Sequence, residues 1–311
     1  MSTILVTGGA GFIGSHLADA LLERGDDVVV IDDLSTGSHD HVPRNAELVE
    51  ADVADAEAVR SAFEGRRFDA VVHIAGQASI SKSFDNPEND LRVNVVGTLN
   101  VIDQMVAHGV SRLVYASSMT AYGEPQTIPT PESEPCIPIS YYGVTKYAAE
   151  RYVQVAGART DVELSVTSLR MFNVFGEGQS LTNPYQGVLA IFIGNVLRGE
   201  PITIHSDGKQ TRDFVYIGDV VDAWLRVLAD PGTRGGVYNV GSGRETTIAE
   251  LAQAVVRAFG HDEWEIHTGP EQRGDLRRSC ADVNALEQAT GWRPHTSLDE
   301  GMRRTIDWAR R

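Results

Sequence analysis

The sequence predicts an α/β fold, in which a doubly wound parallel sheet carries a smaller C-terminal α/β cap. Short apolar runs rich in β-branched residues alternate with amphipathic helical segments through the first half of the chain. Continuous apolar strands of this kind are typical of a parallel sheet buried on both faces. Beyond about Asn173 the elements are shorter, beginning with a Gly-, Pro- and Asn-rich stretch at 176–187. This half is too irregular for a second doubly wound sheet, so we expect a cap.

The expected elements follow one another in a regular order. The strands of the first half are predicted at 3–8, 26–32, 46–52, 68–76, 111–118 and 164–172, with the first amphipathic helix at 14–24. In the second half we expect a helix at 188–200 and a strand at 201–206. No internal repeat, low-complexity tract or flexible linker interrupts this order.

Composition narrows the class of protein. The 311 residues include 43 acidic and 27 basic ones, a formal net charge of -16, which argues against nucleic acid or an anionic membrane as partner. The two cysteines, Cys136 and Cys280, are too few for a disulfide framework and lack metal-ligand spacing, so no metal site is expected. Without a basic leader or an apolar run of about 20 residues, we expect a cytoplasmic protein.

A glycine-rich turn joins the first strand to the first helix. Gly8, Gly11 and Gly14 have G-x-x-G-x-x-G spacing, which lets the backbone turn tightly and approach a pyrophosphate at the positive end of the helix. Asp32 ends the second strand, where a carboxylate accepts hydrogen bonds from an adenosine ribose. A 2′-phosphate there would meet both Asp32 and Asp33, so NAD is favoured over NADP.

Two residues at the end of the third strand belong to the same expected site. Asp52 and Val53 offer an edge for the adenine amino group. A polar strand terminus with no ligand is the alternative explanation.

The stretch 140–150 places two tyrosines side by side before a lysine. Tyr142 and Lys146 are four residues apart and share one helix face, whereas Tyr141 has Thr145 at that spacing. An ammonium roughly 6 Å from a phenol favours the phenolate by about 3 kcal/mol at an effective dielectric of about 20. We therefore expect the Tyr142 pKa to fall from about 10 towards 8, which suits general acid–base chemistry.

The Y-x-x-x-K spacing alone is common by chance, and a surface lysine above a half-buried tyrosine is the alternative. Its position favours chemistry, because it follows the strand at 111–118. That strand ends in Ser117 and Ser118, whose hydroxyls could hydrogen-bond a substrate alcohol.

The order of these motifs carries a family resemblance over essentially the whole chain. The segments are TGGAGFIG, VIDDLSTG, HIAG, NVVGTLNV, ASSMTAYG, YYGVTK, LRMFNVFG, GKQTRDFVYIGDVVDA and YNVGSG. Together they resemble the extended short-chain dehydrogenase/reductase family and, within it, the NAD-dependent nucleotide-sugar 4-epimerases. The resemblance implies that Tyr142 is the catalytic base, that Lys146 holds the nicotinamide ribose and tunes the tyrosine, and that Ser118 positions the reacting sugar oxygen.

The resemblance also implies the residues of two binding sites. The NAD site is expected to include Gly8, Gly11, Phe12, Ile13, Gly14, Asp32, Asp33, Ser35, Thr36, Gly37, Asp52, Val53, Ile74, Ala75, Gly76, Gln77, Asn94, Ser117, Tyr142, Lys146 and Phe172. The substrate site is expected to include Ser118, Tyr142, Asn173, Gly187, Val188, Thr203, Ile204, His205, Arg212, Arg273 and Asp275.

Arg212 matches the family arginine that pairs with the substrate diphosphate, which suits a forked guanidinium. The alternative is an arginine that satisfies Asp213 or Asp219. Asp275 matches a contact to the nucleoside ribose. One departure is that Gln272 stands where the family usually has a further arginine, with Arg273 beside it.

The resemblance also narrows the reaction to C4 epimerisation of a UDP-sugar. Related dehydratases and decarboxylases carry acidic residues where this chain has Met119 and Thr120. Uronate-specific relatives have an arginine early in the segment that here, between Gly176 and Leu197, lacks Arg and Lys. UDP-glucose and UDP-galactose are therefore favoured, and the small Ser279 leaves UDP-GlcNAc and UDP-GalNAc open. A UDP-glucuronate 4-epimerase, a dTDP-sugar epimerase or reductase, and a non-catalytic dinucleotide sensor are the alternatives.

The same resemblance implies a domain division and an assembly. Residues 1–173 are expected to form the NAD-binding Rossmann domain, with a returning segment around 212–241, and residues 174–311 the substrate-binding domain. The helices near 97–108 and 142–156 are expected to pair across a two-fold axis in a homodimer, although packing on the sheet also explains their apolar faces.

Overall fold

The computed structural model describes residues 1–183 and 187–311, and within them the main sheet has seven strands, all parallel. In spatial order these are β11 (Val237–Val240), β6 (Ser165–Met171), β5 (Arg112–Ser118), β4 (Ala70–His73), β1 (Thr3–Thr7), β2 (Asp27–Asp32) and β3 (Glu47–Glu50). The strand order reverses beside β1, and ligands of such sheets bind at the carboxyl ends of the strands near this reversal. The predicted fold class is confirmed.

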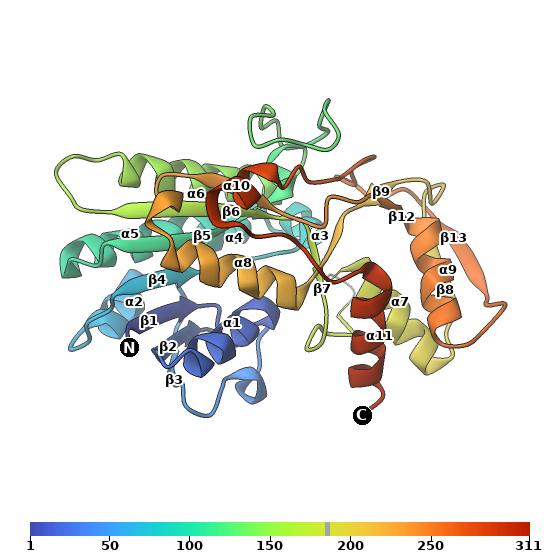
Figure 1. Ribbon diagram of the computed structural model, residues 1–311, viewed down its shortest axis with the longest axis horizontal. Coiled ribbons are helices and arrows are strands. Elements are labelled where there is room, and N and C mark those ends of the chain that lie inside the picture. Colours follow the sequence, from blue (N-terminus) through green and yellow to red (C-terminus); the bar gives the residue numbers. More distant parts are fainter. Residues whose placement is uncertain (184–186) are drawn as a thin grey trace.

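Helices cover both faces of the sheet, because side chains along each strand alternate in direction. Ile4 and Val6 of β1 pack in one apolar core, and Leu5 between them packs in the other. The first core is covered by α1 (Phe12–Glu23), α8 (Ile217–Ala229) and α10 (Asn284–Thr290). The second is covered by α2 (Ala56–Phe63), α5 (Gly97–His108) and α6 (Tyr141–Gly157). Figure 1 shows α5 and α6 on one side of the strands and α1 and α8 on the other.

The connection from β4 to α5 is a broken helix. It consists of α3 (Ile80–Asp85), α4 (Pro87–Leu91) and a π-helical turn (Arg92–Val96) that runs directly into α5. Asn86 caps α4 by accepting a hydrogen bond from the Asn89 backbone N–H, and Pro87 occupies the first helical position. The π turn carries Asn94, and such turns are frequent at functional sites.

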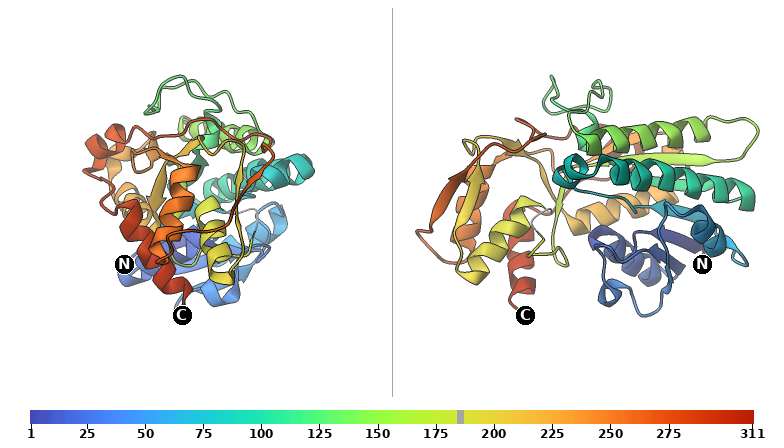
Figure 2. Two further views of the ribbon diagram at one scale, coloured as in Figure 1. Left: turned by 90° about the vertical axis from the view of Figure 1, so that its right-hand side faces the viewer. Right: turned by 180° about the vertical axis from the view of Figure 1, so that it is seen from behind.

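The cap follows β6 and therefore lies at the carboxyl end of the sheet (Figure 2). Its own apolar core includes Phe192, Leu251 and Ile306. Its helices are α7 (Val188–Arg198), α9 (Ile248–Ala258) and α11 (Leu298–Ala309). Its paired strands are β7 (Asn173–Phe175) with β10 (Phe214–Tyr216), β8 (Ile202–His205) with β13 (Ile266–Gly269), and β9 (Thr211–Arg212) with β12 (Thr246–Thr247).

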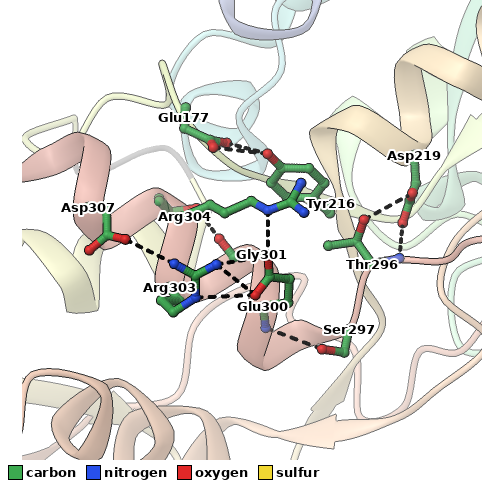
Figure 3. A network of polar contacts seen from close by, with 11 residues as sticks. Glu177, Tyr216, Asp219, Thr296, Ser297, Glu300, Gly301, Arg303, Arg304 and Asp307 are labelled. Atoms are coloured by element: carbon green, nitrogen blue, oxygen red, sulfur yellow. Dashed lines mark hydrogen bonds and ion pairs between the residues drawn. The ribbon is translucent and has the colours of Figure 1, made fainter.

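A network of polar contacts ties α11 to the segment after β7 (Figure 3). The Tyr216 hydroxyl donates to the Glu177 carboxylate at 2.8 Å, and the Arg304 guanidinium lies 5.4 Å from the centre of the Tyr216 ring. Arg304 in turn donates to Glu300 at 2.7 Å. Through Tyr216, helix α11 therefore stabilises the loop after β7, where the chain passes from the main sheet into the cap.

The returning segment reaches the main sheet through β11, which pairs with β6. The division into residues 1–173 and 174–311 stays a prediction. No helix among the described residues is long and apolar enough to cross a membrane. Those residues also contain no group of three or more His, Cys, Asp or Glu side chains arranged to hold a metal ion.

Candidate active site

The glycine-rich turn lies in a tight space between neighbouring strands. Gly8 has φ +72°, and its N–H donates to the carbonyl of Ile31 at 2.7 Å. A Cβ on Gly8 would lie 2.7 Å from the backbone nitrogen of Ala75, and one on Gly14 would lie 2.1 Å from the Gly8 oxygen. These positions require glycine, because a side chain would push the start of α1 away from the turn.

Gly14→Ala is therefore expected to lower the melting temperature, although alanine normally stabilises a helix relative to glycine. Gly11→Ala is the matched comparison with a milder steric clash, because its Cβ would meet only the Gly8 oxygen at 3.3 Å. We expect Gly11→Ala to keep the melting temperature and to weaken NAD binding, since its methyl would enter the proposed pyrophosphate site. Thermal unfolding and NAD titration check both variants; equal melting temperatures for the two would contradict the packing argument.

Asp32 is buried at the end of β2 and is held by the loops on either side of it. Its carboxylate accepts from the backbone N–H groups of Ala10 and Leu34, each at 2.9 Å. Burial raises the Asp32 pKa, and these two hydrogen bonds oppose that rise. A fixed carboxylate at the strand end is what the expected ribose contact needs.

The neighbouring acidic residues have partners of their own. Asp33 turns toward solvent and accepts from the Ser35 N–H and hydroxyl at 3.0 and 2.6 Å. Asp52 forms an ion pair with Arg92 of the π turn at 2.7 Å. The contact of Asp33 and Asp52 with an adenosine stays a prediction.

Tyr142 lies in the first turn of α6, which Ser140 caps by accepting from the Gly143 N–H at 3.1 Å. Burial raises the pKa of the Tyr142 phenol to about 12, whereas a hydrogen bond from Ser118 lowers it and the Asp90 charge raises it further. The expectation that the pKa falls towards 8 is therefore wrong for the polypeptide alone. Desolvation is the largest effect on the phenol, and the Lys146 ammonium lies against another ring.

That ring is Tyr115 of β5, whose centre is 4.6 Å from the Lys146 ammonium. Lys146 itself is buried, and burial lowers its pKa to about 8 although Asp90 and Glu150 act in the opposite direction. The lysine is therefore mostly protonated at pH 7. The site holds a desolvated positive charge one helical turn after the phenol.

A small space between Gly76, Asn94 and Lys146 lies beside this charge, and we call it the ligand cradle. A Cβ on Gly76 would lie 2.8 Å from the Asn94 side-chain oxygen and 3.8 Å from the Lys146 ammonium. That oxygen is buried and accepts no hydrogen bond from any described residue. A carbonyl oxygen and an ammonium facing the same small space suit a pair of ribose hydroxyls. The residues present therefore fit a dinucleotide.

Other predicted cofactor residues have structural partners. The Ser117 hydroxyl donates to Glu150 at 2.6 Å, away from Ser118. The backbone N–H groups of Ile74 and Ala75 donate to the Thr7 hydroxyl at 3.2 Å. The main sheet and α6 therefore position these residues.

The other predicted cofactor residues differ in burial. Phe12 and Ile13 are partly buried against the cap core, Val53 and Phe172 are buried, Gly37 packs on Ala10, and Thr36 is exposed.

On the cap side, Arg212 forms an ion pair with Asp275 and donates to the carbonyl of Leu276 at 2.8 Å. The alternative partners are engaged elsewhere: Asp213 accepts from the Ala281 N–H at 2.9 Å and Asp219 from the Thr296 N–H at 2.9 Å. Arg212 and Asp275, which were both predicted to bind the substrate, therefore form an ion pair with each other. Burial lowers the Arg212 pKa, and Asp275 opposes this.

Asn173 begins β7, which pairs with β10. Its backbone N–H donates to the carbonyl of Asp213, the residue after Arg212, at 3.0 Å. Its side-chain oxygen is buried and has no hydrogen-bond partner among the described residues. The oxygen is a second candidate for a ligand contact.

The remaining predicted substrate residues lie on the edges of the cap. His205 of β8 contacts the Pro270 carbonyl at 2.9 Å, and Arg273 is exposed. Thr203 and Ile204 lie on the same strand as His205, and Gly187 and Val188 lie at the start of α7. Their contact with a substrate stays a prediction.

Sequence reasoning missed the side chains beneath the pair Tyr142 and Lys146. Asp90 is fully buried, and the Thr145 hydroxyl donates to it at 2.5 Å. A signal existed, because Asp90 precedes Asn94 by four residues and so shares its helix face. No comparable spacing linked Asp90 to α6.

Comparison with known proteins gives one consistent family. Residues 4–241 match the NAD dependent epimerase/dehydratase family. The UDP-glucose 4-epimerase of Mycolicibacterium smegmatis is 39% identical over 313 residues, covering 98% of each chain. A solved UDP-glucose 4-epimerase of Thermotoga maritima with UDP-glucose has a TM-score of 0.95 at 38% identity, covering 99% of this chain and 98% of that one. The Thermus thermophilus UDP-glucose 4-epimerase complexed with NAD has a TM-score of 0.92 at 40% identity, covering 99% of each chain.

Proposed function

The chain belongs to the NAD-dependent epimerase/dehydratase family, and on that premise we propose that it is an isomerase that interconverts UDP-glucose and UDP-galactose with bound NAD. The observation that carries the proposal is the half-buried Tyr142, whose phenol is hydrogen-bonded by Ser118 and which precedes the buried Lys146 by one helical turn. The cradle at Gly76 and Asn94 adjoins the same ammonium.

In this proposal Tyr142 takes the proton of the sugar 4-hydroxyl, and Ser118 hydrogen-bonds the sugar oxygen. NAD, held by the glycine-rich turn, Asp32 and the space between Gly76 and Asn94, would supply reversible hydride transfer at C4. Tyr142 would give the proton back to the same sugar oxygen when the 4-keto group is reduced on its other face. Lys146 would hold the nicotinamide ribose and would keep a positive charge near the phenol. For Tyr142 to act near pH 7 its pKa must fall from about 12, and the positive nicotinamide ring acts in that direction.

The sugar must turn over while the nucleotide stays in place. Arg212 is suited to bind the diphosphate because it is buried and because its ion pair with Asp275 fixes the orientation of its guanidinium. The buried Asn173 oxygen offers a further polar contact on the same side. Affinity then resides mainly in the nucleotide, and free sugars are very poor substrates.

The residues after Ser118 weigh against dehydration and decarboxylation. Met119 cannot transfer a proton, and the Thr120 hydroxyl donates to the Ser118 oxygen at 2.9 Å. Neither can act as the additional acid that elimination requires. A net reductase is disfavoured by Asp32, which would repel the 2′-phosphate of NADPH.

A 2-acetamido sugar is the second candidate substrate, since Ser279 is small and buried. Its hydroxyl lies 3.6 Å from the sulfur of Met119, and the crevice that both line with Phe172 and Leu276 has no room for a water molecule. We therefore place UDP-glucose and UDP-galactose first.

A panel of nucleotide sugars tests the proposed function. Purified protein is incubated with UDP-galactose, UDP-GlcNAc, UDP-glucuronate, dTDP-sugars and free galactose, without added cofactor, and the C4 epimers are separated by chromatography. We expect UDP-galactose and UDP-glucose to interconvert, with free galactose unchanged and no NADH released. Turnover of dTDP-sugars alone, or stoichiometric release of NADH, would contradict the proposal.

We also propose a cytoplasmic homodimer. Exposed apolar side chains form a stripe along α6, with Val144, Tyr152 and Val155 at 48%, 49% and 58% exposure, and Val96 lies on the neighbouring π turn. This face could bury itself against a second copy; sedimentation as a monomer at micromolar concentration would refute it. The unpaired cysteines support a reducing compartment.

A further inference from the structure

Asp90 of α4 is a buried carboxylate, and every described residue that donates a hydrogen bond to it is neutral. Its side chain accepts from the Gln77 amide at 2.6 Å, the Thr145 hydroxyl at 2.5 Å and the Asn94 amide at 3.3 Å. The residue is 0% exposed, and no ion pair to it is found in residues 1–183 and 187–311. A carboxylate buried this way is costly, so its retention calls for a counter-charge at longer range.

Lys146 provides that counter-charge. It follows Thr145 on α6, whose hydroxyl donates to Asp90. Burial lowers the Lys146 pKa and the Asp90 charge opposes this, while burial raises the Asp90 pKa and its hydrogen bonds and the Lys146 charge oppose that rise. Glu150 is the other acidic group that acts on Lys146, but Arg170 neutralises it in a two-pronged ion pair. Asp90 is thus the acidic group near Lys146 that has no arginine partner among the described residues.

Within the part of the chain that the structure describes, the other groups that interact with Lys146 carry no charge that could replace Asp90. The Tyr115 ring packs on the ammonium, and burial raises the pKa of its phenol well above the ordinary value. His73 of β4 is neutral, because burial and the Lys146 charge lower its pKa to about 3. Tyr142 is a neutral phenol at pH 7 in the polypeptide alone.

Asp90, together with the Gln77 carbonyl, fixes which way the Asn94 amide points. The Asn94 nitrogen donates to the Gln77 carbonyl at 3.1 Å, to Thr145 at 3.0 Å and to Asp90. An ionised carboxylate only accepts hydrogen bonds, so it holds the nitrogen on its own side. The unpartnered Asn94 oxygen then faces Gly76 and Lys146.

We propose that Asp90 is a positioning residue, whose carboxylate helps to hold the Asn94 oxygen toward the ligand cradle and whose charge, next to Thr145, favours the protonated form of Lys146. This inference rests on the proposed function only in that Lys146 serves the reaction. The electrostatic part concerns the polypeptide itself.

Asp90→Asn removes the charge and can keep the hydrogen bonds. The new amide oxygen would accept from Gln77 and Asn94, and its nitrogen would donate to Thr145. The Thr145 hydroxyl already lies 3.1 Å from the Tyr142 carbonyl and can donate there instead. Glu88→Gln is the matched control, because it removes an exposed carboxylate from the same short helix.

The charge state of Lys146 can be measured directly, because Lys82, Lys146 and Lys209 are the lysines of the chain. The NAD-loaded protein is labelled with 13C-lysine, and the Cε resonances are titrated by NMR and assigned with Lys82→Arg and Lys209→Arg. We expect the Lys146 midpoint to fall by about 1 to 2 pH units in Asp90→Asn and to stay unchanged in Glu88→Gln. An unchanged midpoint in folded Asp90→Asn would overturn the proposal.

The pH profile of kcat for UDP-galactose gives the second readout. Because Lys146 loses its proton earlier in Asp90→Asn, the ratio of wild-type to variant rates should grow about tenfold between pH 6 and pH 8. A loss of rate that is equal at all pH values would indicate a structural role and overturn the proposal. If no sugar in the panel reacts, the NMR titration still decides the electrostatic inference, so the two failures are distinguishable.

Discussion

Tyr142→Phe is expected to lower the rate of C4 epimerisation by about 10²- to 10⁴-fold, while the protein keeps its NAD. The substitution removes one hydroxyl from a half-buried residue and leaves the packing volume almost unchanged. Ser118 would lose its phenol partner, whereas the proposed cofactor contacts at Asp32, Gly76 and Lys146 involve other atoms. The loss should therefore appear in kcat and not in NAD affinity. Steady-state kinetics with UDP-galactose and calorimetric titration with NAD measure the two quantities.

Tyr141→Phe is the matched control, since it removes the same hydroxyl from the neighbouring residue. Tyr141 is 48% exposed, and its ring contacts Phe84 with centres 5.5 Å apart. We expect wild-type rates from this variant. Full activity of Tyr142→Phe, or equal losses in both variants, would show that the wrong tyrosine has been assigned.

Much of the fold follows from patterns that are local in the sequence. Apolar runs such as 3–7 and 27–32 specify strands buried on both faces, and the glycine spacing requires a tight turn before α1. The pairing of β8 with β13 was not predicted, because Ile266–Gly269 is a short and largely exposed strand. Its place depends on the cap core around it, which no local pattern encodes.

The site was predicted where its residues share one helix and missed where they come together from separate elements. The spacing of Tyr142 and Lys146 is local, so the pair could be selected. The partner of Arg212 is Asp275, 63 residues away, and no spacing rule identifies it. The Tyr142 pKa was wrong in direction because burial, which only the folded structure reveals, outweighs a charge on the next turn.

The buried ion pair of Glu150 and Arg170 also joins residues that are distant in sequence, so no local pattern predicts it. We expect the largest loss of stability from a substitution that breaks this pair. Glu150 of α6 is 0% exposed, and it accepts from Arg170 of β6 at 2.9 and 2.6 Å and from the Ser117 hydroxyl at 2.6 Å. Arg170 also stacks on the Tyr122 ring at 4.7 Å and donates to a backbone carbonyl. The guanidinium is thus fully engaged inside the protein, and its charge depends on this one carboxylate.

Glu150→Gln is expected to lower the free energy of unfolding by about 3–5 kcal/mol, because it leaves the Arg170 charge buried without a counter-ion. Urea denaturation followed by circular dichroism measures the loss. Asp161→Asn is the control: its ion pair with Arg159 is exposed at 2.7 Å, and such pairs contribute at most about 1 kcal/mol. Equal losses in the two variants would mean that water reaches Arg170. Because Glu150 follows Lys146 by one turn of α6, a large loss in Glu150→Gln alone would also show that this ion pair fixes the helix that carries the proposed catalytic residues.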